Sequence, residues 1–236
     1  MIKNRFFPYS WHTDQVETER TILRIYGISE NNQNVCVRID NFTPYIYLEL
    51  PTYLDWNNKK AQILADKIDK IMKEQKPFKK ALVWKKKLYG ANLDENGQRK
   101  LFPFLLCSFA HRKDIKTLGY KIRQRIHIVL PNGKIESVQL YIHEADANEV
   151  LQLTCCRNIP TAGWIEFVGV LVSKQLQETL CDLEYKVKWK NLNPHENDIV
   201  AKPKIMSFDI EVNSTNPSAM PKANKPGDVV FQISCV

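Results

Sequence analysis

Hydrophobic and polar positions first alternate along this chain and then recur at helical spacing. Apolar, β-branched runs predict strands at residues 20–28, 34–42 and 44–50. The polar stretch SENNQN separates the first two strands, and Pro44 precedes the third. This opening is typical of an antiparallel β meander.

The pattern changes to a helical period at residues 55–75. An apolar stripe there faces a set of lysines and aspartates, as in an amphipathic helix that covers a core. Asn57 or Asn58 can cap its amino terminus, and Pro77 ends it. We therefore expect one long helix after the opening strands.

Further strands dominate the rest of the chain. Strands are predicted at 79–90 and 101–110, with a turn at Asn96–Gly97 between them, and a short helix at 111–120 follows. The remaining predicted elements are a hairpin of strands 120–130 and 134–145 about Asn132–Gly133, a helix at 146–158 capped by Asp146, strands at 163–173 and 181–192, and a polar linker at 193–203.

Strands with three or so helices, in no regular alternation, indicate an α+β fold. The linker combines two prolines with mixed charge, which is typical of a domain boundary. We therefore expect a first domain at residues 1–198 and the start of a second domain at residues 199–236.

Charge and cysteine content narrow the class of protein. A net charge of +8 is compatible with a polyanionic partner, although many basic proteins have none. No run reaches the roughly 18 apolar residues of a membrane span, and the first residues lack the apolar core of a secretion signal. The six cysteines show no zinc-ligand spacing, so we expect reduced, mostly buried thiols in an intracellular protein.

The segment KIMSFDIEVNS, residues 204–214, places two carboxylates inside an apolar, β-branched run. Asp209 and Glu211 share one face of a strand, since side chains alternate. The apolar neighbours suggest a central strand covered on both faces, where two like charges would be costly. Mg²⁺ or Mn²⁺ would relieve that cost and could serve phosphodiester hydrolysis. The alternative is a half-exposed strand whose acidic face is incidental.

Two other residue groups are candidates for contact with nucleic acid. In the predicted strand 120–130, Lys121, Arg123 and Arg125 share a face and could bind phosphates, or they form a solvated outer surface. Tyr45 and Tyr47 share a face that excludes Ile46. They could stack on bases, although such aromatic residues more often belong to a core.

The stretch IMSFDIEVNS and the later GDVVFQISCV resemble the first exonuclease motif and following strand of family B DNA polymerases. Upstream segments are also similar to this family, above all to its delta-type and large DNA virus members. These segments are RIYGISENNQNVCVRIDNFTPYIYLELP, LYGANLDENGQRKLFPFLLCSF, HEADANEVLQLTCCRNIPTAGWIEF and LEYKVKWKNLNP, in the family's order.

The resemblance implies an amino-terminal domain with OB-like barrel and RRM-like subfolds, followed by the first strands of an RNase H-like exonuclease domain. It implies a replicative DNA polymerase with a 3′–5′ proofreading exonuclease, in which Asp209 and Glu211 are catalytic metal ligands for Mg²⁺ or Mn²⁺. The implied partners are template and primer DNA, deoxynucleoside triphosphates bound by other domains and, as a candidate, a sliding clamp. The implied location is the nucleus or a viral replication site.

The family's second and third exonuclease motifs and its YGDTDS polymerase motif do not occur in this sequence. We therefore expect an amino-terminal fragment that is inactive alone and binds no metal tightly. The competing hypothesis is a non-catalytic module for nucleic acid or protein interaction. A stand-alone nuclease of the same class is a third hypothesis.

Overall fold

A computed structural model describes residues 3–14, 21–87 and 93–236 of the chain. The chain divides into two compact units, Met1–Ile199 and Val200–Val236. Unit 1 contains a closed barrel and a separate four-stranded sheet, and unit 2 contains a two-stranded sheet. Among the described residues no helix is long and apolar enough to cross a membrane. The α+β class predicted from the pattern is confirmed.

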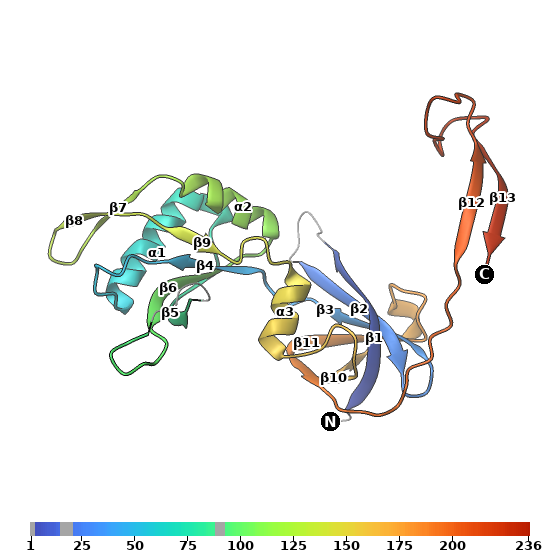
Figure 1. The fold of residues 1–236 in the computed structure, drawn as a ribbon, viewed down its shortest axis with the longest axis horizontal. Helices are drawn as coiled ribbons and strands as arrows, with labels where there is room; N and C mark the ends of the chain where they lie inside the picture. The colour runs from blue at the N-terminus through green and yellow to red at the C-terminus, as the bar shows by residue number, and fades with distance from the viewer. Residues whose placement is uncertain (1–2, 15–20, 88–92) are drawn as a thin grey trace. The chain divides into compact units, whose positions relative to one another are not determined.

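Five strands of unit 1 close into a barrel (Figure 1). Around the barrel these are β1 (Asn4–Asp14), β10 (Ile165–Leu171), β11 (Leu183–Pro194), β3 (Asn34–Ile39) and β2 (Ile22–Ser29). All neighbours pair antiparallel except β11 and β3, which run parallel. The short 3₁₀ turn η2 (Lys174–Leu176) lies in the connection between β10 and β11. Closure leaves the barrel without a free sheet edge.

The barrel core is formed by inward-facing positions of all five strands. Phe6 and Phe167 are fully buried and meet edge to face, with ring centroids 5.5 Å apart. Each such buried side chain contributes about 2 kcal/mol through removal of apolar area from water. The sequence pattern did not predict β1, because Pro8 interrupts it. The pairing register of β1 shifts between Pro8 and Ser10, and a bulge of this kind accommodates proline in a strand.

The second sheet of unit 1 has the strand order β5-β6-β4-β9. Its strands are β5 (Lys79–Lys86), β6 (Leu101–Ser108), β4 (Tyr45–Glu49) and β9 (Tyr141–His143). The meander predicted for the first three strands is therefore wrong in part. Strands β2 and β3 do pair, but β4 pairs with β6 and β9 instead. Ile46 and Leu48 decide this placement, because both are fully buried in the core beneath the helices.

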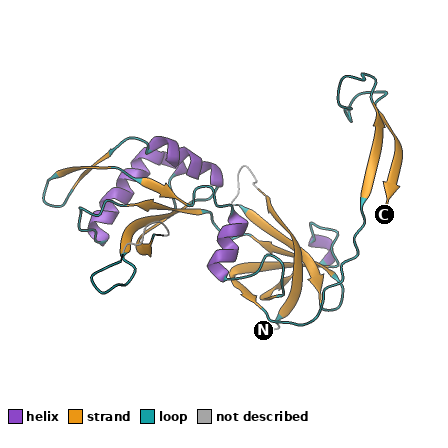
Figure 2. Cartoon of the chain, in the orientation of Figure 1, coloured by secondary structure: helices purple, strands orange, loops and turns teal. Residues whose placement is uncertain are grey.

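Helices α1 (Asn58–Met72) and α2 (Arg112–Lys121) cover one face of this sheet (Figure 2). Asn57 caps α1, and its side chain accepts a hydrogen bond from the backbone N–H of Lys60 at 3.0 Å. The predicted apolar stripe is confirmed, since Leu64 and Ile68 are fully buried. The 3₁₀ turn η1 (Lys73–Gln75) ends this segment.

The structure corrects the predicted bounds of the hairpin about Gly133 and the predicted cap of the helix that follows it. The hairpin about Gly133 is confirmed, but it consists of the short strands β7 (Ile126–Val129) and β8 (Ile135–Val138). Helix α3 (Glu149–Arg157) is capped by Asn148 rather than by Asp146. The Asn148 side chain accepts from the backbone N–H of Leu151 at 2.8 Å, three residues along the chain, where a capping oxygen must lie.

The cysteines are all free thiols, as expected, but only three of them are buried. Cys36, Cys107 and Cys181 lie in the interior, and burial raises the pKa of Cys36 and Cys107 to about 12. Cys155, Cys156 and Cys235 are exposed.

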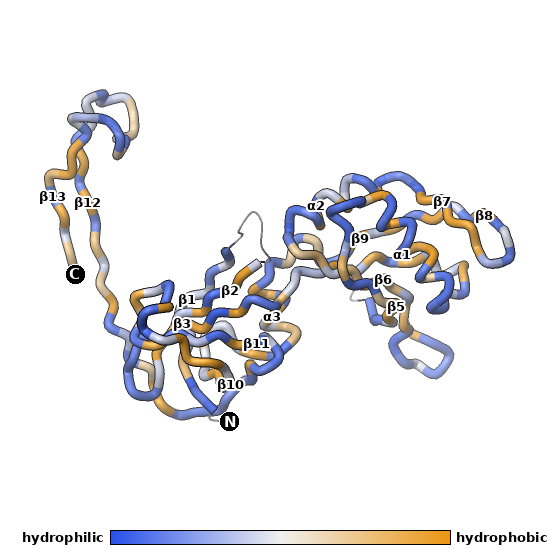
Figure 3. The backbone as a smooth tube through the Cα atoms, turned by 180° about the vertical axis from the view of Figure 1, so that it is seen from behind, coloured by the Kyte–Doolittle hydropathy of each residue, from blue (hydrophilic) through white to orange (hydrophobic). Residues whose placement is uncertain are grey.

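Unit 2 is a ribbon of two antiparallel strands, β12 (Phe208–Asn213) and β13 (Val229–Cys235). Figure 3 shows β13 as mainly hydrophobic. Phe208 and Ile210 are nevertheless 63% and 46% exposed. The expectation of a central strand covered on both faces is therefore wrong for this chain, because β12 pairs only with β13 among the described residues.

Candidate functional site

Asp209 and Glu211 lie on β12 at alternate positions, so their side chains share one face of the ribbon. Their backbone partners across the ribbon are Ser234 and Gln232 of β13. Both acidic residues are exposed. Two carboxylates about 4 Å or more apart in water repel each other by about 1 kcal/mol or less. The exposed ribbon therefore tolerates the pair without a counter-ion.

A divalent metal ion fits this pair as part of a ligand set. Carboxylate oxygens are the ligands that Mg²⁺ and Mn²⁺ prefer, and Mg²⁺ is commonly held by one or two carboxylates together with substrate phosphates. The backbone N–H of Ile210 donates to the Asp209 side chain at 2.9 Å, which restricts that carboxylate. The described residues contain no group of three or more His, Cys, Asp or Glu that could hold a metal ion by itself.

Asp228 organises the loop that joins β12 to β13. Its carboxylate accepts hydrogen bonds from the backbone N–H and hydroxyl of Thr215, both at 2.8 Å, and from the backbone N–H of Lys222 at 3.0 Å. These bonds from Thr215 and Lys222 lower the pKa of Asp228 to about 2. Gly227 has φ +91°, and a Cβ there would lie 2.7 Å from the Thr215 methyl carbon. The sequence identified Asp228 only through the family motif.

Tyr45 and Tyr47 lie on the face of the four-stranded sheet opposite the helices, as their alternation with Ile46 predicted. Their ring centroids are 5.6 Å apart, and Tyr47 lies 6.2 Å from Phe104. Phe104 in turn lies 5.5 Å from the His143 ring. We call Tyr45, Tyr47, Phe102, Phe104 and His143 the aromatic sheet face. It draws side chains from β4, β6 and β9.

Charged groups border the aromatic sheet face. The Lys85 ammonium lies 5.4 Å from the centre of the Tyr47 ring. Burial raises the pKa of Tyr47 to about 12, with a smaller contribution from Glu144. Burial also raises the pKa of Glu144, and the nearby cation of Lys85 opposes that shift. Both tyrosines are half-buried, so their ring surfaces are partly accessible.

Lys85 and His143 were not singled out in the sequence. Strand alternation places Lys85 on one of two faces, but only the pairing of β5 with β6 and of β4 with β9 brings these residues beside Tyr47. Tyr89 and Gly90 belong to the segment LYGANLDENGQRKLFPFLLCSF noted above, and both lie outside the described residues.

The predicted basic strand face of Lys121, Arg123 and Arg125 is wrong. Lys121 ends helix α2, residues 122–124 form a turn and bend, and β7 begins only at Ile126. Ile122 is buried against the helices, which favours continuing the helix to this point.

Lys121, Arg123 and Arg125 therefore do not lie on one face of a strand, and each has different surroundings. Lys121 donates from Nζ to the backbone carbonyl of Ile71 at 3.0 Å. The Arg123 guanidinium lies 5.3 Å from the centre of the Tyr120 ring. Arg125 lines a small cavity together with Tyr53 and Tyr141.

Residues 140–236 match the family model for the exonuclease domain of DNA polymerase family B. DNA polymerase 120R of Invertebrate iridescent virus 3 is 38% identical over 98% of this chain and 21% of its own length. DNA polymerase 037L of Invertebrate iridescent virus 6 is 36% identical over 100% of this chain and 20% of its own length.

A more distant relative is the DNA polymerase of Acanthamoeba polyphaga mimivirus, 26% identical over 95% of this chain and 13% of its own length. The fold is similar to that of the family B DNA polymerase from the hyperthermophilic archaeon Pyrobaculum calidifontis. That match has a TM-score of 0.62 at 16% identity and covers 88% of this chain and 22% of that one. The chain spans about a fifth of the length of its iridescent virus relatives. The chain is therefore similar to viral DNA polymerases over nearly its whole length, and its residues 140–236 match the exonuclease domain of the family B DNA polymerases.

Proposed function

We propose that this chain is part of a replicative DNA-directed DNA polymerase with a 3′–5′ proofreading exonuclease. In the whole protein it contributes template contacts and the first two carboxylates of the exonuclease site. The observation that carries the proposal is the placement of Asp209 and Glu211 on one face of β12, within the stretch that matches the exonuclease domain. The relatives named above support it, since each is a DNA polymerase.

Asp209 and Glu211 are the proposed ligands for Mg²⁺ or Mn²⁺. Mg²⁺ or Mn²⁺ held by these carboxylates would supply Lewis acidity toward a water molecule and the leaving oxygen of a phosphodiester. Asp209 would supply oxygens from a carboxylate restricted by the Ile210 N–H. Glu211 would supply a second ligand and help to orient the attacking water. Asp228 supports the two residues indirectly by fixing the loop between β12 and β13.

The chain alone is expected neither to polymerise nor to proofread. Two carboxylates provide only part of a two-metal site, and the other exonuclease motifs and the polymerase motif do not occur in its sequence. Residues 199–236 are the proposed start of the RNase H-like domain, and residues 1–198 are the proposed amino-terminal domain.

The four-stranded sheet supports an RRM-like assignment. Its elements follow the order β4-α1-β5-β6-α2-β9, and its strands lie in the order β5-β6-β4-β9. This is the split β-α-β arrangement, which RRM domains use with aromatic residues on the two central strands to stack bases. Tyr47 on β4 and Phe104 on β6 occupy central strands here, and Tyr47 offers the accessible ring because it is half-buried whereas Phe104 is only 4% exposed. The aromatic sheet face is therefore the proposed contact with single-stranded template.

The barrel supports an OB-like assignment. The four-stranded sheet and its helices lie between β3 and α3 in the chain. Without that insertion, a meander of β1, β2 and β3 is followed by helix α3 and by β10 and β11, with β11 beside β3. OB-folds bind oligonucleotides with five-stranded barrels of this kind. The proposed partners are template and primer DNA, with deoxynucleoside triphosphates and a sliding clamp engaging other domains. The proposed location is the nucleus or a viral replication site.

The test uses the full-length protein with Asp209→Ala and Glu211→Ala combined. Exonuclease activity should fall by more than about 100-fold, since even the outer partners of metal ligands are worth about 10–100-fold. Primer extension should persist. Glu196→Ala with Asp198→Ala is a matched control, because these exposed acids have the same one-residue spacing. Full exonuclease activity in the first variant would refute the assignment.

A further inference from the structure

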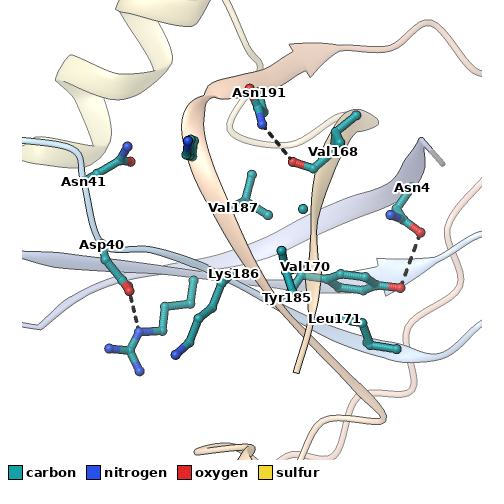
Figure 4. Close-up of a pocket in the computed structure, with 13 residues that line it drawn as sticks. Asn4, Asp40, Asn41, Val168, Val170, Leu171, Tyr185, Lys186, Val187 and Asn191 are labelled. Carbon is teal, nitrogen blue, oxygen red and sulfur yellow. Dashed lines mark hydrogen bonds and ion pairs between the residues drawn. The ribbon is translucent and has the colours of Figure 1, made fainter. Parts of the chain in front are cut away.

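A groove of about 980 Å³ lies beside β10 and β11 of the barrel (Figure 4). It exists because β11 separates from β10 partway along. Phe167 pairs with Leu192, whereas Gly169 pairs with Val187, so residues 188–191 of β11 lie opposite Val168 alone. The Asn191 side chain donates to the Val168 carbonyl at 3.2 Å and holds the bulged segment in place.

One side of the groove offers cations and amide donors. Lys186 and Lys188 line it at alternate positions of β11, and both are exposed without a charged partner among the described residues. The side-chain oxygens of Asn4 and Asn41 already accept hydrogen bonds, from the Tyr185 hydroxyl at 3.4 Å and from the backbone N–H of Trp189 at 3.2 Å. Their NH₂ groups are left to donate to a ligand.

The lining carries little opposing negative charge. Asp40 is the one carboxylate among the described lining residues, and it accepts from the Arg38 guanidinium at 2.7 Å. Unpaired lysines beside a neutralised carboxylate make the groove complementary to an anion.

The other side of the groove is apolar. Val170 is 71% exposed and Leu171 is 53% exposed, although both belong to a barrel strand. Tyr185 is half-buried, and its ring lies edge to face against Phe167 at 5.0 Å. An accessible aromatic and aliphatic surface beside cations suits a ligand in which flat apolar groups accompany regularly spaced anions.

The neighbouring outer face of β2 and β3 cannot bind such a ligand with its own arginines. Glu178, in the connection between β10 and β11, pairs with both Arg24 and Arg38. Glu184, 1% exposed, anchors that connection by accepting hydrogen bonds from the backbone N–H groups of Glu178 and Thr179, each at 3.1 Å. Among the described residues in this part of the barrel, the cations without a charged partner therefore lie on β11.

We infer that this groove is a second binding site for single-stranded nucleic acid, with Lys186 and Lys188 on the phosphates and Val170, Leu171 and Tyr185 against bases. The inference rests on the proposed function and adds a site on the barrel to the one on the aromatic sheet face. Contact is independent of sequence, since the lining offers phosphate contacts and apolar surface.

The experiment measures binding of a fluorescent oligo(dT) to the 236-residue chain by anisotropy over a range of salt concentrations. Lys186→Gln with Lys188→Gln should weaken binding severalfold. The slope of log K against log salt should become shallower by about 1.4, because each phosphate contact on a single strand contributes about 0.7. Lys67→Gln with Lys70→Gln is the matched control, removing two exposed charges from helix α1.

A third variant, Tyr47→Ala, separates this inference from the proposed function. Weaker binding in Tyr47→Ala, with the Lys186/Lys188 variant equal to its control, overturns the groove and leaves the sheet face standing. Weaker binding only in the Lys186/Lys188 variant supports the groove and refutes the sheet face. No binding by the unmodified chain overturns both sites. Protection of residues 185–191 from amide hydrogen exchange by oligo(dT), but not by an acidic peptide, would identify the occupant as nucleic acid.

Discussion

At the scale of single residues, Asp228 shows how one carboxylate can hold a loop next to a proposed catalytic strand. Its side chain is 1% exposed and accepts three hydrogen bonds from Thr215 and Lys222. These bonds favour the charged form, which is why the pKa falls from 3.8 to about 2. The interaction is therefore fully present above pH 3.8 and is lost as the pH falls through about 2.

We predict that the backbone amide signals of Thr215 and Lys222 titrate together with a midpoint near pH 2, as measured by NMR. Asp228→Asn should remove this titration and increase amide exchange in the loop, because a neutral amide accepts fewer and weaker bonds from these donors. Asp198→Asn, at an exposed position, should change neither. A midpoint near pH 4 would contradict the loop-holding role.

At the scale of elements, helix α3 is joined to strand β4 by one side chain. Gln152, 2% exposed, accepts from the Tyr45 backbone N–H at 3.2 Å and donates to the Tyr45 carbonyl at 2.7 Å. Its amide thus satisfies the backbone groups of Tyr45 as a neighbouring strand would. The Tyr45 hydroxyl also lies 3.2 Å from the Cys156 sulfur of the same helix. The first residue of the aromatic sheet face is therefore fixed from α3.

Gln152→Leu should lower the free energy of unfolding by about 2–6 kcal/mol, since both Tyr45 backbone groups lose their partner at about 1–3 kcal/mol each. Chemical denaturation measures this change. Gln62→Leu, on the exposed side of α1, is the matched control and should shift stability by less than about 0.5 kcal/mol. Equal stability of the two variants would show that Gln152 does not join these elements.

At the scale of the whole molecule, the chain forms two units that share no element. The segment between the last barrel strand and β12 exposes apolar side chains, including Val200 at 75% and Ile205 at 83%. Unit 1 has its own two hydrophobic cores, and neither includes a residue of Val200–Val236. Unit 1 should therefore not depend on unit 2 for stability.

We predict that residues 1–199 alone melt within about 2 °C of the full chain. Limited proteolysis of the full chain should cleave first within residues 199–207. A large drop in melting temperature on removal of residues 200–236 would show that unit 2 stabilises unit 1.

The sequence by itself determined the elements whose local pattern is strong. The apolar period of α1, the Asn57 cap and the turn at Gly133 need only neighbouring residues, so they were predictable. The acidic pair of β12 was predictable for the same reason, because strand alternation alone places Asp209 and Glu211 on one face.

Tertiary structure decided the features that depend on partners distant in the chain. It assigned β4 to a different sheet from β3, and it ended α2 at Lys121 where the sequence predicted a strand. It also brought Lys85, Phe104 and His143 beside Tyr47, and it opened the groove where β11 leaves β10. Strand register and burial fix these arrangements, and both arise from contacts between segments that no local pattern specifies.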